Sequence, residues 1–207
     1  MKTMMVRTCW VLGLAFVLIL PLLLLTSGAF SPTVAAEDGA AQERALEDHV
    51  IIAGYGLTGQ ELARSLEDCG VSYTIVDINP ENVRRAVRHE EPAYFGDVTS
   101  AAVLESLGLA RARALVLVIN DITATVRSLH AARRVAPEIP VFVRVVYAAD
   151  INRAIKAGAT EVIASELEAS AEVTHRILER CSVGAALVAT QVDRIRDRRE
   201  DEHDDQE

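Results

Sequence analysis

Between His49 and Cys181, short apolar runs alternate with longer stretches in which apolar residues recur at helical spacing. This alternation is typical of a parallel sheet whose strands are joined by helices. The apolar runs predict strands near 50–54, 73–77, 93–95, 114–119, 140–146 and 161–164. The stretches between and after them predict helices near 57–69, 80–90, 100–107, 121–135, 149–157 and 167–180. We therefore expect an α/β fold, a doubly wound parallel sheet of six strands.

The first apolar run, Val50 to Ala53, leads into three spaced glycines. Gly54, Gly56 and Gly59 form the pattern G-x-G-x-x-G, which provides a tight turn, close approach of a pyrophosphate to the backbone, and close packing of helix on strand. The helix that follows directs its unpaired N–H groups and the positive end of its dipole towards the phosphates. The segment predicts the opening of a dinucleotide-binding unit.

The second apolar run, Tyr73 to Val76, ends at Asp77, which lies 18 residues after Gly59. A carboxylate at this place can accept hydrogen bonds from both ribose hydroxyls and would repel a 2′-phosphate. Asp77 therefore favours NAD over NADP as the ligand.

Polar residues also follow the later strands, at the edge where an open α/β sheet binds its ligand. Asp97 can cap the next helix or bond an adenine, and Asp121 is expected to cap its helix. Asn120 is the ligand candidate after the fourth strand. Arg144 lies in an otherwise apolar strand, where its guanidinium needs a partner. A phosphate suits its fork geometry, and an ion pair with Asp97 or Glu166 is the alternative.

Residues 1–30 form a separate apolar module. Lys2 and Arg7 precede the uncharged run from Trp10 to Leu25, which predicts one apolar helix close to the length of about 20 residues that spans a bilayer. We expect a single-pass membrane anchor with the following domain in the cytoplasm, where nucleotides are, although the positive-inside rule would place that domain outside. The alternative is a cleaved signal peptide and an exported domain.

Composition predicts the remaining boundaries. Residues 31–48 are expected to be a polar linker, and residues 49–181 the globular domain. Residues 182–207 begin apolar and end in a highly charged stretch. We expect this tail to extend the last helix or to pack on a partner, and then to become partly disordered.

Charge and cysteine content exclude two kinds of site. The formal net charge is −9 and no basic face stands out, so we expect no nucleic-acid partner. The three cysteines show no metal-ligand spacing, and we expect no metal site.

Longer stretches resemble a known family. The runs VIIAGYGLTGQELARSLEDCGVSYTIVDINPENV, YFGDVTSAAVLESLGLARARALVLVIND, VFVRVV and AGATEVIAS resemble the N-terminal RCK domain (regulator of potassium conductance, also called the Trk-type NAD-binding domain) over residues 49 to 181. The resemblance implies a Rossmann fold that dimerises through its last helices and binds NAD(H), AMP, ADP or ATP. It also implies that Asp77 holds the ribose, Asp97 lies beside the adenosine, and Arg144 approaches the phosphates or the dimer partner. The candidate cofactor-binding residues are Gly54, Tyr55, Gly56, Leu57, Thr58, Gly59, Asp77, Ile78, Asp97, Val98, Asn120 and Arg144.

We therefore expect a regulatory domain that binds NAD(H), or else AMP, ADP or ATP, without chemistry. Its expected partners are a second copy, through the last helix, and the pore subunit of a potassium channel or transporter, because the chain has no Thr-Val-Gly-Tyr-Gly filter. One alternative is an NAD-dependent oxidoreductase, yet no tyrosine has a lysine four residues later, as a short-chain dehydrogenase requires. The other alternative is a structural relic that no longer binds nucleotide. Members of the resembled family often carry arginine between the second and third glycines of the motif, where this chain has Leu57 and Thr58, which weakens the charge compensation for a phosphate.

Overall fold

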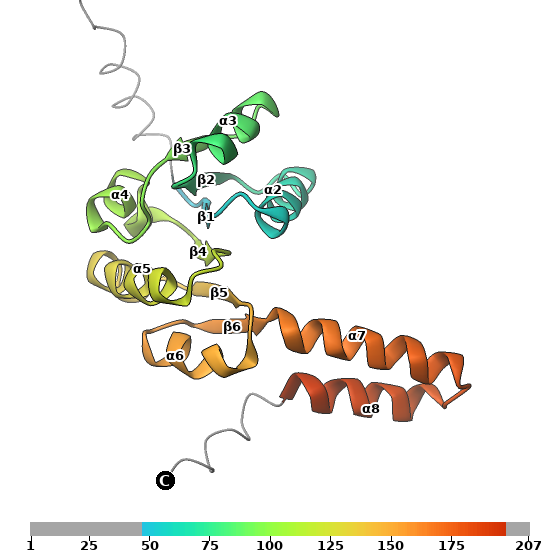
Figure 1. Ribbon diagram of the computed structural model, residues 1–207. Helices are drawn as coiled ribbons and strands as arrows, with labels where there is room; N and C mark the ends of the chain where they lie inside the picture. The colour runs from blue at the N-terminus through green and yellow to red at the C-terminus, as the bar shows by residue number, and fades with distance from the viewer. Residues whose placement is uncertain (1–46, 198–207) are drawn as a thin grey trace, which may run out of the picture. The chain divides into compact units, whose positions relative to one another are not determined.

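The computed structural model describes residues 47–197, which form one sheet with helices on both faces (Figure 1). The strands are β1 (Val50–Ala53), β2 (Tyr73–Asp77), β3 (Ala93–Phe95), β4 (Ala114–Leu117), β5 (Val141–Val145) and β6 (Glu161–Ala164). Their order is β3-β2-β1-β4-β5-β6, and every neighbouring pair is parallel. The predicted fold class is confirmed. The order reverses between β1 and β4, so these two strands form the switch point at which such sheets bind ligands.

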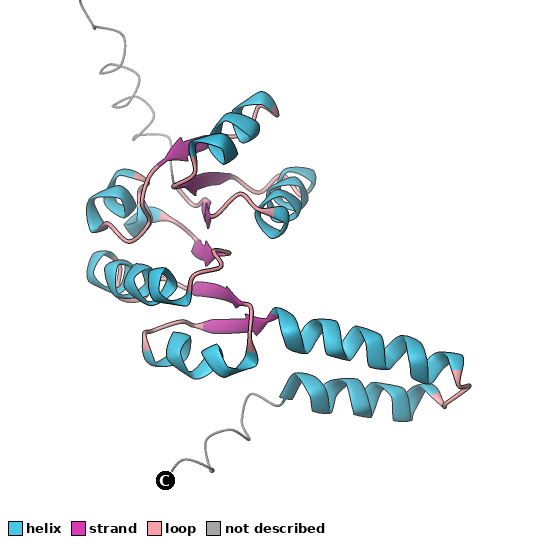
Figure 2. Ribbon diagram, viewed as in Figure 1, coloured by secondary structure: helices cyan, strands magenta, loops and turns pink. Residues whose placement is uncertain are grey.

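Helices fill the connections between the strands (Figure 2). They are α2 (Leu57–Asp68), α3 (Pro80–Arg88), α4 (Ala101–Ser106), α5 (Ile122–Val135), α6 (Ile151–Lys156), α7 (Ser165–Arg180) and α8 (Ala185–Arg196). The Asp121 carboxylate caps α5, as predicted, by accepting from the N–H groups of Thr123 at 2.7 Å and Ala124 at 3.0 Å. Asn79 caps α3 in the same way, and Pro80 at the first turn lacks the N–H that would otherwise need a partner.

Two apolar cores lie on the two faces of the sheet. On one face, Ile52 and Ile75 pack with Ala63 of α2 and Ala86 of α3. On the other face a larger core joins the central strands to α4, α5 and α6, and it includes Leu129 of α5, whose side chain is fully buried. Consecutive right-handed crossovers place α2 and α3 together on the first face and the next three helices on the second.

The first face is covered over only part of its width. All four residues of β1 are buried, whereas buried and half-buried residues alternate along β5. Phe142, Arg144 and Ile163 are half-buried, and they belong to neither apolar core. Helices therefore cover both faces of the sheet near β1, but only one face over β5 and β6.

The segment after Cys181 forms a helix of its own. Ser182 turns the chain with a positive φ of 58°, and α8 then runs back beside α7 (Figure 1). Val188 and Val192 of α8 pack against Ala171 of α7. Of the two alternatives expected for this apolar segment, extension of the last helix is therefore wrong, while packing on a partner stays a prediction. The cause is the left-handed turn at Ser182, which ends α7 and reverses the direction of the chain.

The membrane localisation expected from the sequence needs correction. The longest helix within residues 47–197 is α7, at 16 residues, and none of the helices there combines the length and the hydropathy needed to cross a bilayer. The run from Trp10 to Leu25, on which the expectation of an anchor or signal peptide depended, lies outside the described residues.

Candidate functional site

The glycine loop turns between the end of β1 and the start of α2. Gly54 has a φ of +106°, which side-chain-bearing residues rarely adopt. A Cβ on Gly59 would lie 2.0 Å from the carbonyl oxygen of Gly54, so the helix can approach the strand this closely only with glycine at that position. A Cβ on Gly54 would lie 3.1 Å from the Val118 carbonyl oxygen, just beyond the end of β4. Both glycines are therefore required by packing at the switch point.

Gly56 differs from its two neighbours in the motif, because a Cβ there would meet nothing within 4 Å. Gly56 is also the N-cap of α2. It offers no side chain to the N–H groups of the first turn, and that turn contains no acidic residue. The helix therefore presents its positive end and its unpaired donors to open space, an arrangement that fits a phosphate.

Asp77, at the end of β2, is 8 % exposed and already accepts three hydrogen bonds. Its Oδ2 accepts from the Tyr55 N–H at 2.7 Å and from Asn82 Nδ2 at 2.8 Å, while Oδ1 accepts from the Asn79 N–H at 2.7 Å. A carboxylate offers about four acceptor sites, so one site remains on Oδ1. The geometry thus leaves room for one ribose hydroxyl at full strength, where the sequence had suggested two.

Tyr55 connects the glycine loop to α3. Arg85 of α3 donates to the Tyr55 carbonyl oxygen at 2.9 Å, and its guanidinium lies 5.7 Å from the centre of the Tyr55 ring, within the range of a cation–π contact. Arg85 also donates to Asn82 Oδ1 at 2.8 Å. Sequence reasoning missed Asn82 and Arg85. Their separation of three residues on the helix after Asp77, which puts both side chains on one face, is the signal that could have identified them.

The second half of the site brings together Asn120, after β4, and Arg144 of β5. One guanidinium nitrogen of Arg144 donates to Asn120 Oδ1 at 2.8 Å, while its Nε is buried and has no partner among the described residues. The expected alternative, an ion pair with Asp97 or Glu166, is not formed among those residues. Arg144 therefore keeps an unused donor beside Asn120, next to the end of β4, which fits an anionic ligand.

The remaining candidates line the rim or the core. Leu57 is 77 % and Ile78 63 % exposed, and Thr58 is exposed as well. Val98 is buried in the larger core, so only its backbone can face a ligand. Asp97 accepts from the Thr99 N–H at 2.9 Å, which stabilises the turn before α4.

A small polar pocket lies between α2 and the turn that precedes β3. Its volume is about 200 Å³, and its lining residues are Tyr55, Gln60, Arg64, Glu67, His89 and Glu91. Glu91 accepts hydrogen bonds from the hydroxyls of Tyr55, at 3.4 Å, and Tyr73. Burial, together with the Glu91 carboxylate, raises the pKa of both phenols, so both remain donors at neutral pH.

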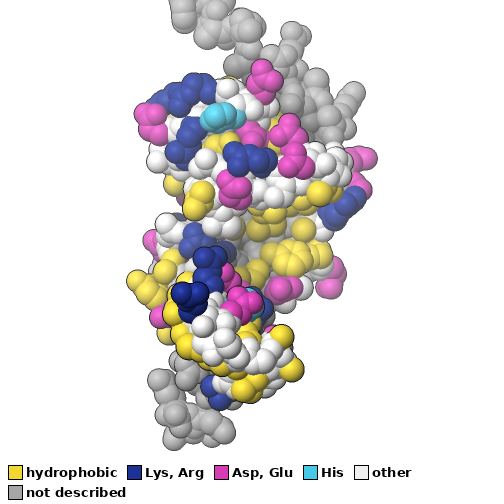
Figure 3. Space-filling view, turned by 90° about the vertical axis from the view of Figure 1, so that its right-hand side faces the viewer, with side chains coloured by type: hydrophobic (Ala, Val, Ile, Leu, Met, Phe, Trp, Pro, Cys, Tyr) yellow, Lys and Arg dark blue, Asp and Glu magenta, His cyan; other side chains and the backbone are white. Residues whose placement is uncertain are grey.

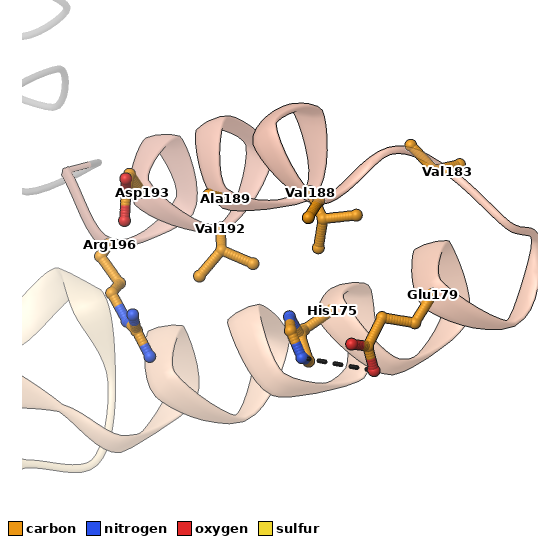
Figure 4. Close-up of a pocket in the computed structure, with 9 residues that line it drawn as sticks. His175, Glu179, Val183, Val188, Ala189, Val192, Asp193 and Arg196 are labelled. Carbon is orange, nitrogen blue, oxygen red and sulfur yellow. Dashed lines mark ion pairs between the residues drawn. The ribbon is translucent and has the colours of Figure 1, made fainter.

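A second groove, of about 490 Å³, lies between α7 and α8 (Figure 4). Val188 and Val192 project into it from α8, and His175 from α7, where it forms an ion pair with Glu179 at 3.4 Å. Among residues 47–197, no group of three or more histidine, cysteine or acidic side chains could hold a metal ion.

The parallel sheet, its switch point and the glycine loop define a Rossmann-like domain. Residues 50–165, more than half of the chain, match the TrkA-N domain, and the chain belongs to this family.

Relatives and solved structures agree with this assignment. "Putative K(+) efflux antiporter KefB" of Alkalimonas amylolytica is 35 % identical over 147 residues, which cover 71 % of this chain but only 22 % of that protein. "Shewanella denitrificans Kef CTD in AMP bound form" superposes with a TM-score of 0.62 at 21 % identity, covering 70 % of this chain and 88 % of that one. "GsuK channel bound to NAD" superposes with a TM-score of 0.57 at 20 % identity, covering 63 % and 24 %. These two likenesses show the shared fold.

Proposed function

We propose that this chain is a regulatory domain of a potassium transport system, which binds NAD(H) or an adenine nucleotide without changing it chemically. The observation that carries the proposal is the open space at Gly56, in front of the uncapped start of α2. That space is bordered by the Asp77 carboxylate, through the Tyr55 N–H. A phosphate donor surface beside a ribose acceptor is what a nucleotide requires.

The other side of the switch point complements this arrangement. The loop at Gly54 touches the end of β4, and Arg144 and Asn120 follow on β5 and after β4. The unpaired Nε of Arg144 offers a positive charge for a phosphate. Relatives of similar fold are described as AMP-bound or NAD-bound, which agrees with either ligand.

Binding without turnover is supported by the residues available for chemistry. The chain has two lysines, Lys2 and Lys156. Lys156 ends α6 and therefore lies towards the edge of the sheet opposite the glycine loop. The described part of the chain contains no lysine at the ligand edge that could act with a tyrosine in hydride transfer. We therefore favour a regulatory role over an oxidoreductase.

Two surfaces support an assembly role. The first face of the sheet is not covered over β5 and β6, where Phe142, Arg144 and Ile163 are half-buried. Hydrophobic side chains also gather in the lower part of Figure 3, where α7 and α8 lie, while the upper part, over α2 and α3, carries mostly charged ones. We propose that a second copy of the chain covers these surfaces and that the pore subunit of a potassium channel or transporter is the further partner.

Nucleotide titration separates the candidate functions. The full-length protein is titrated calorimetrically with NADH and with AMP, and the NADH absorbance is followed for hours in the presence of the protein. Saturable binding with stable absorbance is the result expected for a regulatory domain. Loss of absorbance at a catalytic rate would identify an enzyme, and the absence of binding to either nucleotide would identify a structural relic.

A further inference from the structure

Four hydrogen bonds form a closed ring between the glycine loop and α3. The Tyr55 N–H donates to Asp77 Oδ2 at 2.7 Å, and Asn82 Nδ2 donates to the same oxygen at 2.8 Å. Arg85 then donates from one guanidinium nitrogen to Asn82 Oδ1 at 2.8 Å and to the Tyr55 carbonyl oxygen at 2.9 Å. The ring therefore joins both sides of one loop residue to Asp77.

The ring leaves the Asn82 amide only one orientation. Its nitrogen must face the Asp77 carboxylate, which can only accept, and its oxygen must face the Arg85 guanidinium, which can only donate. Asp77 is almost fully buried, and Asn82 and Arg85 are half-buried, so water competes weakly for these bonds.

This arrangement decides which acceptor site of Asp77 stays free. Oδ2 accepts two bonds and Oδ1 accepts one, from the Asn79 N–H. The unused site is therefore on Oδ1. Without Asn82, the carboxylate would keep only its two backbone donors, and a second acceptor site would open on Oδ2, so Oδ1 would no longer be the single site offered to a ribose hydroxyl.

We propose that Asn82 and Arg85 are positioning residues of the nucleotide site, which hold Asp77 so that its free Oδ1 site recognises one ribose hydroxyl. Neither residue needs to touch the ligand. Arg85 acts on Asp77 through Asn82, and it also holds the loop backbone at the Tyr55 carbonyl. This inference rests on the proposed binding of a nucleotide and adds which residues give that binding its preference for a hydroxylated ribose.

The test compares two probes that differ only at the ribose. AMP and 2′,3′-dideoxy-AMP are titrated calorimetrically into the full-length protein and into Asn82→Ala, Arg85→Met and the control Arg84→Met. Arg84 is exposed on the same helix and pairs with Glu81, so its change to Met removes the same positive charge as Arg85→Met without touching the ring. We expect the wild type to prefer AMP by about tenfold, the ratio that one hydrogen bond to a charged group can give.

In Asn82→Ala the preference should fall to about twofold or less, as expected when a charge-assisted bond is lost. Arg85→Met should lose part of the preference, and Arg84→Met none. Since Asn82→Ala could weaken folding, thermal unfolding is measured for each variant, and Arg85→Met provides an independent test. If both ring variants bound the two probes more weakly by the same factor, the residues would be structural only and the inference would be overturned. Wild type that binds both probes equally would overturn it while leaving nucleotide binding intact. Wild type that binds neither would overturn the proposed function as well.

Discussion

β1 and β5 belong to the same parallel sheet, yet they differ in how the chain covers them. β1 is buried along its whole length, because α2 and α3 pack on one face and α4 and α5 on the other. β5 buries every second residue, and the half-buried positions include Phe142 and Arg144. The glycine-loop half is thus complete within one chain, whereas the β5–β6 half has a face left for something else. Ligand binding should therefore depend mainly on the first half, to which Arg144 adds one contact from β5, and assembly on the second.

The largest expected effect lies in the complete half. Gly56→Val should reduce nucleotide affinity by about 100-fold or more, because the side chain would occupy the open space in front of α2. The free energy of unfolding should fall by no more than about 1 kcal/mol, since a Cβ at this position would meet no heavy atom within 4 Å. Calorimetric titration and urea unfolding measure the two quantities.

Gly59→Ala is the matched control for this substitution. Its Cβ would lie 2.0 Å from the Gly54 carbonyl oxygen, so the fold should lose about 3 kcal/mol or more of stability. A Gly56→Val protein that bound nucleotide normally would mean that the loop serves packing alone.

Asp77→Ala should affect both binding and stability. Nucleotide affinity should fall about tenfold to 100-fold, because a hydrogen bond from the ribose to a charged group is lost. Stability should fall by about 1–3 kcal/mol, because the Tyr55 and Asn79 N–H groups lose their acceptor. Asp97→Ala is the comparison, since that carboxylate accepts from one backbone N–H only. Unchanged affinity in Asp77→Ala would exclude the ribose contact.

Assembly should respond to changes on the hairpin of α7 and α8. Ile177 is 58 % and Leu187 55 % exposed, and the double substitution of both to Glu should raise the dimer dissociation constant about tenfold while leaving nucleotide affinity unchanged. Val87→Glu is the control, because Val87 is 56 % exposed on α3 in the complete half. Sedimentation of the wild type and both variants at tens of micromolar measures the dimer dissociation constant. A wild type that is monomeric with and without nucleotide would contradict the proposed assembly.

The smallest effect concerns His49, whose side chain is 1 % exposed and bonds the Leu107 carbonyl oxygen at 3.0 Å. Burial lowers the pKa of His49 below its usual value of 6.5, against the opposing effect of the Leu107 carbonyl. The unfolded state therefore binds more protons than the folded state below about pH 6.5. The contribution of His49 to the free energy of unfolding is fully present above that pH and is lost as pH falls through the lowered pKa of the folded state.

His49→Leu should flatten this pH dependence, as measured by urea unfolding between about pH 5 and pH 8. His130→Leu, at an exposed position, should leave the dependence unchanged. If the free energy of unfolding of His49→Leu changed with pH as steeply as that of the wild type, the acid sensitivity would belong to other groups.

The fold could be predicted from the sequence because parallel strands covered on both faces consist of continuous apolar residues, as in the run Val50 to Ala53. The glycine loop was also readable, since each glycine lies at a fixed spacing. The roles of Asn82 and Arg85 were not, because they depend on how α3 is rotated against the end of β2. The start of α8 was missed because Ser182 adopts a left-handed conformation that its residue type does not indicate.

The position of β1 at the centre of the sheet has a mechanical consequence. Asp48 enters the strand with its carboxylate bound to Arg113, and His49 is tied to the Leu107 carbonyl. Beyond them, β1 is bonded along both sides, to β2 and to β4. Tension applied to the chain ahead of Asp48 would load these bonds in shear, all at once, instead of peeling an edge strand bond by bond. Because β1 runs directly into Gly54, such a pull would be transmitted as strain to the glycine loop before the sheet came apart.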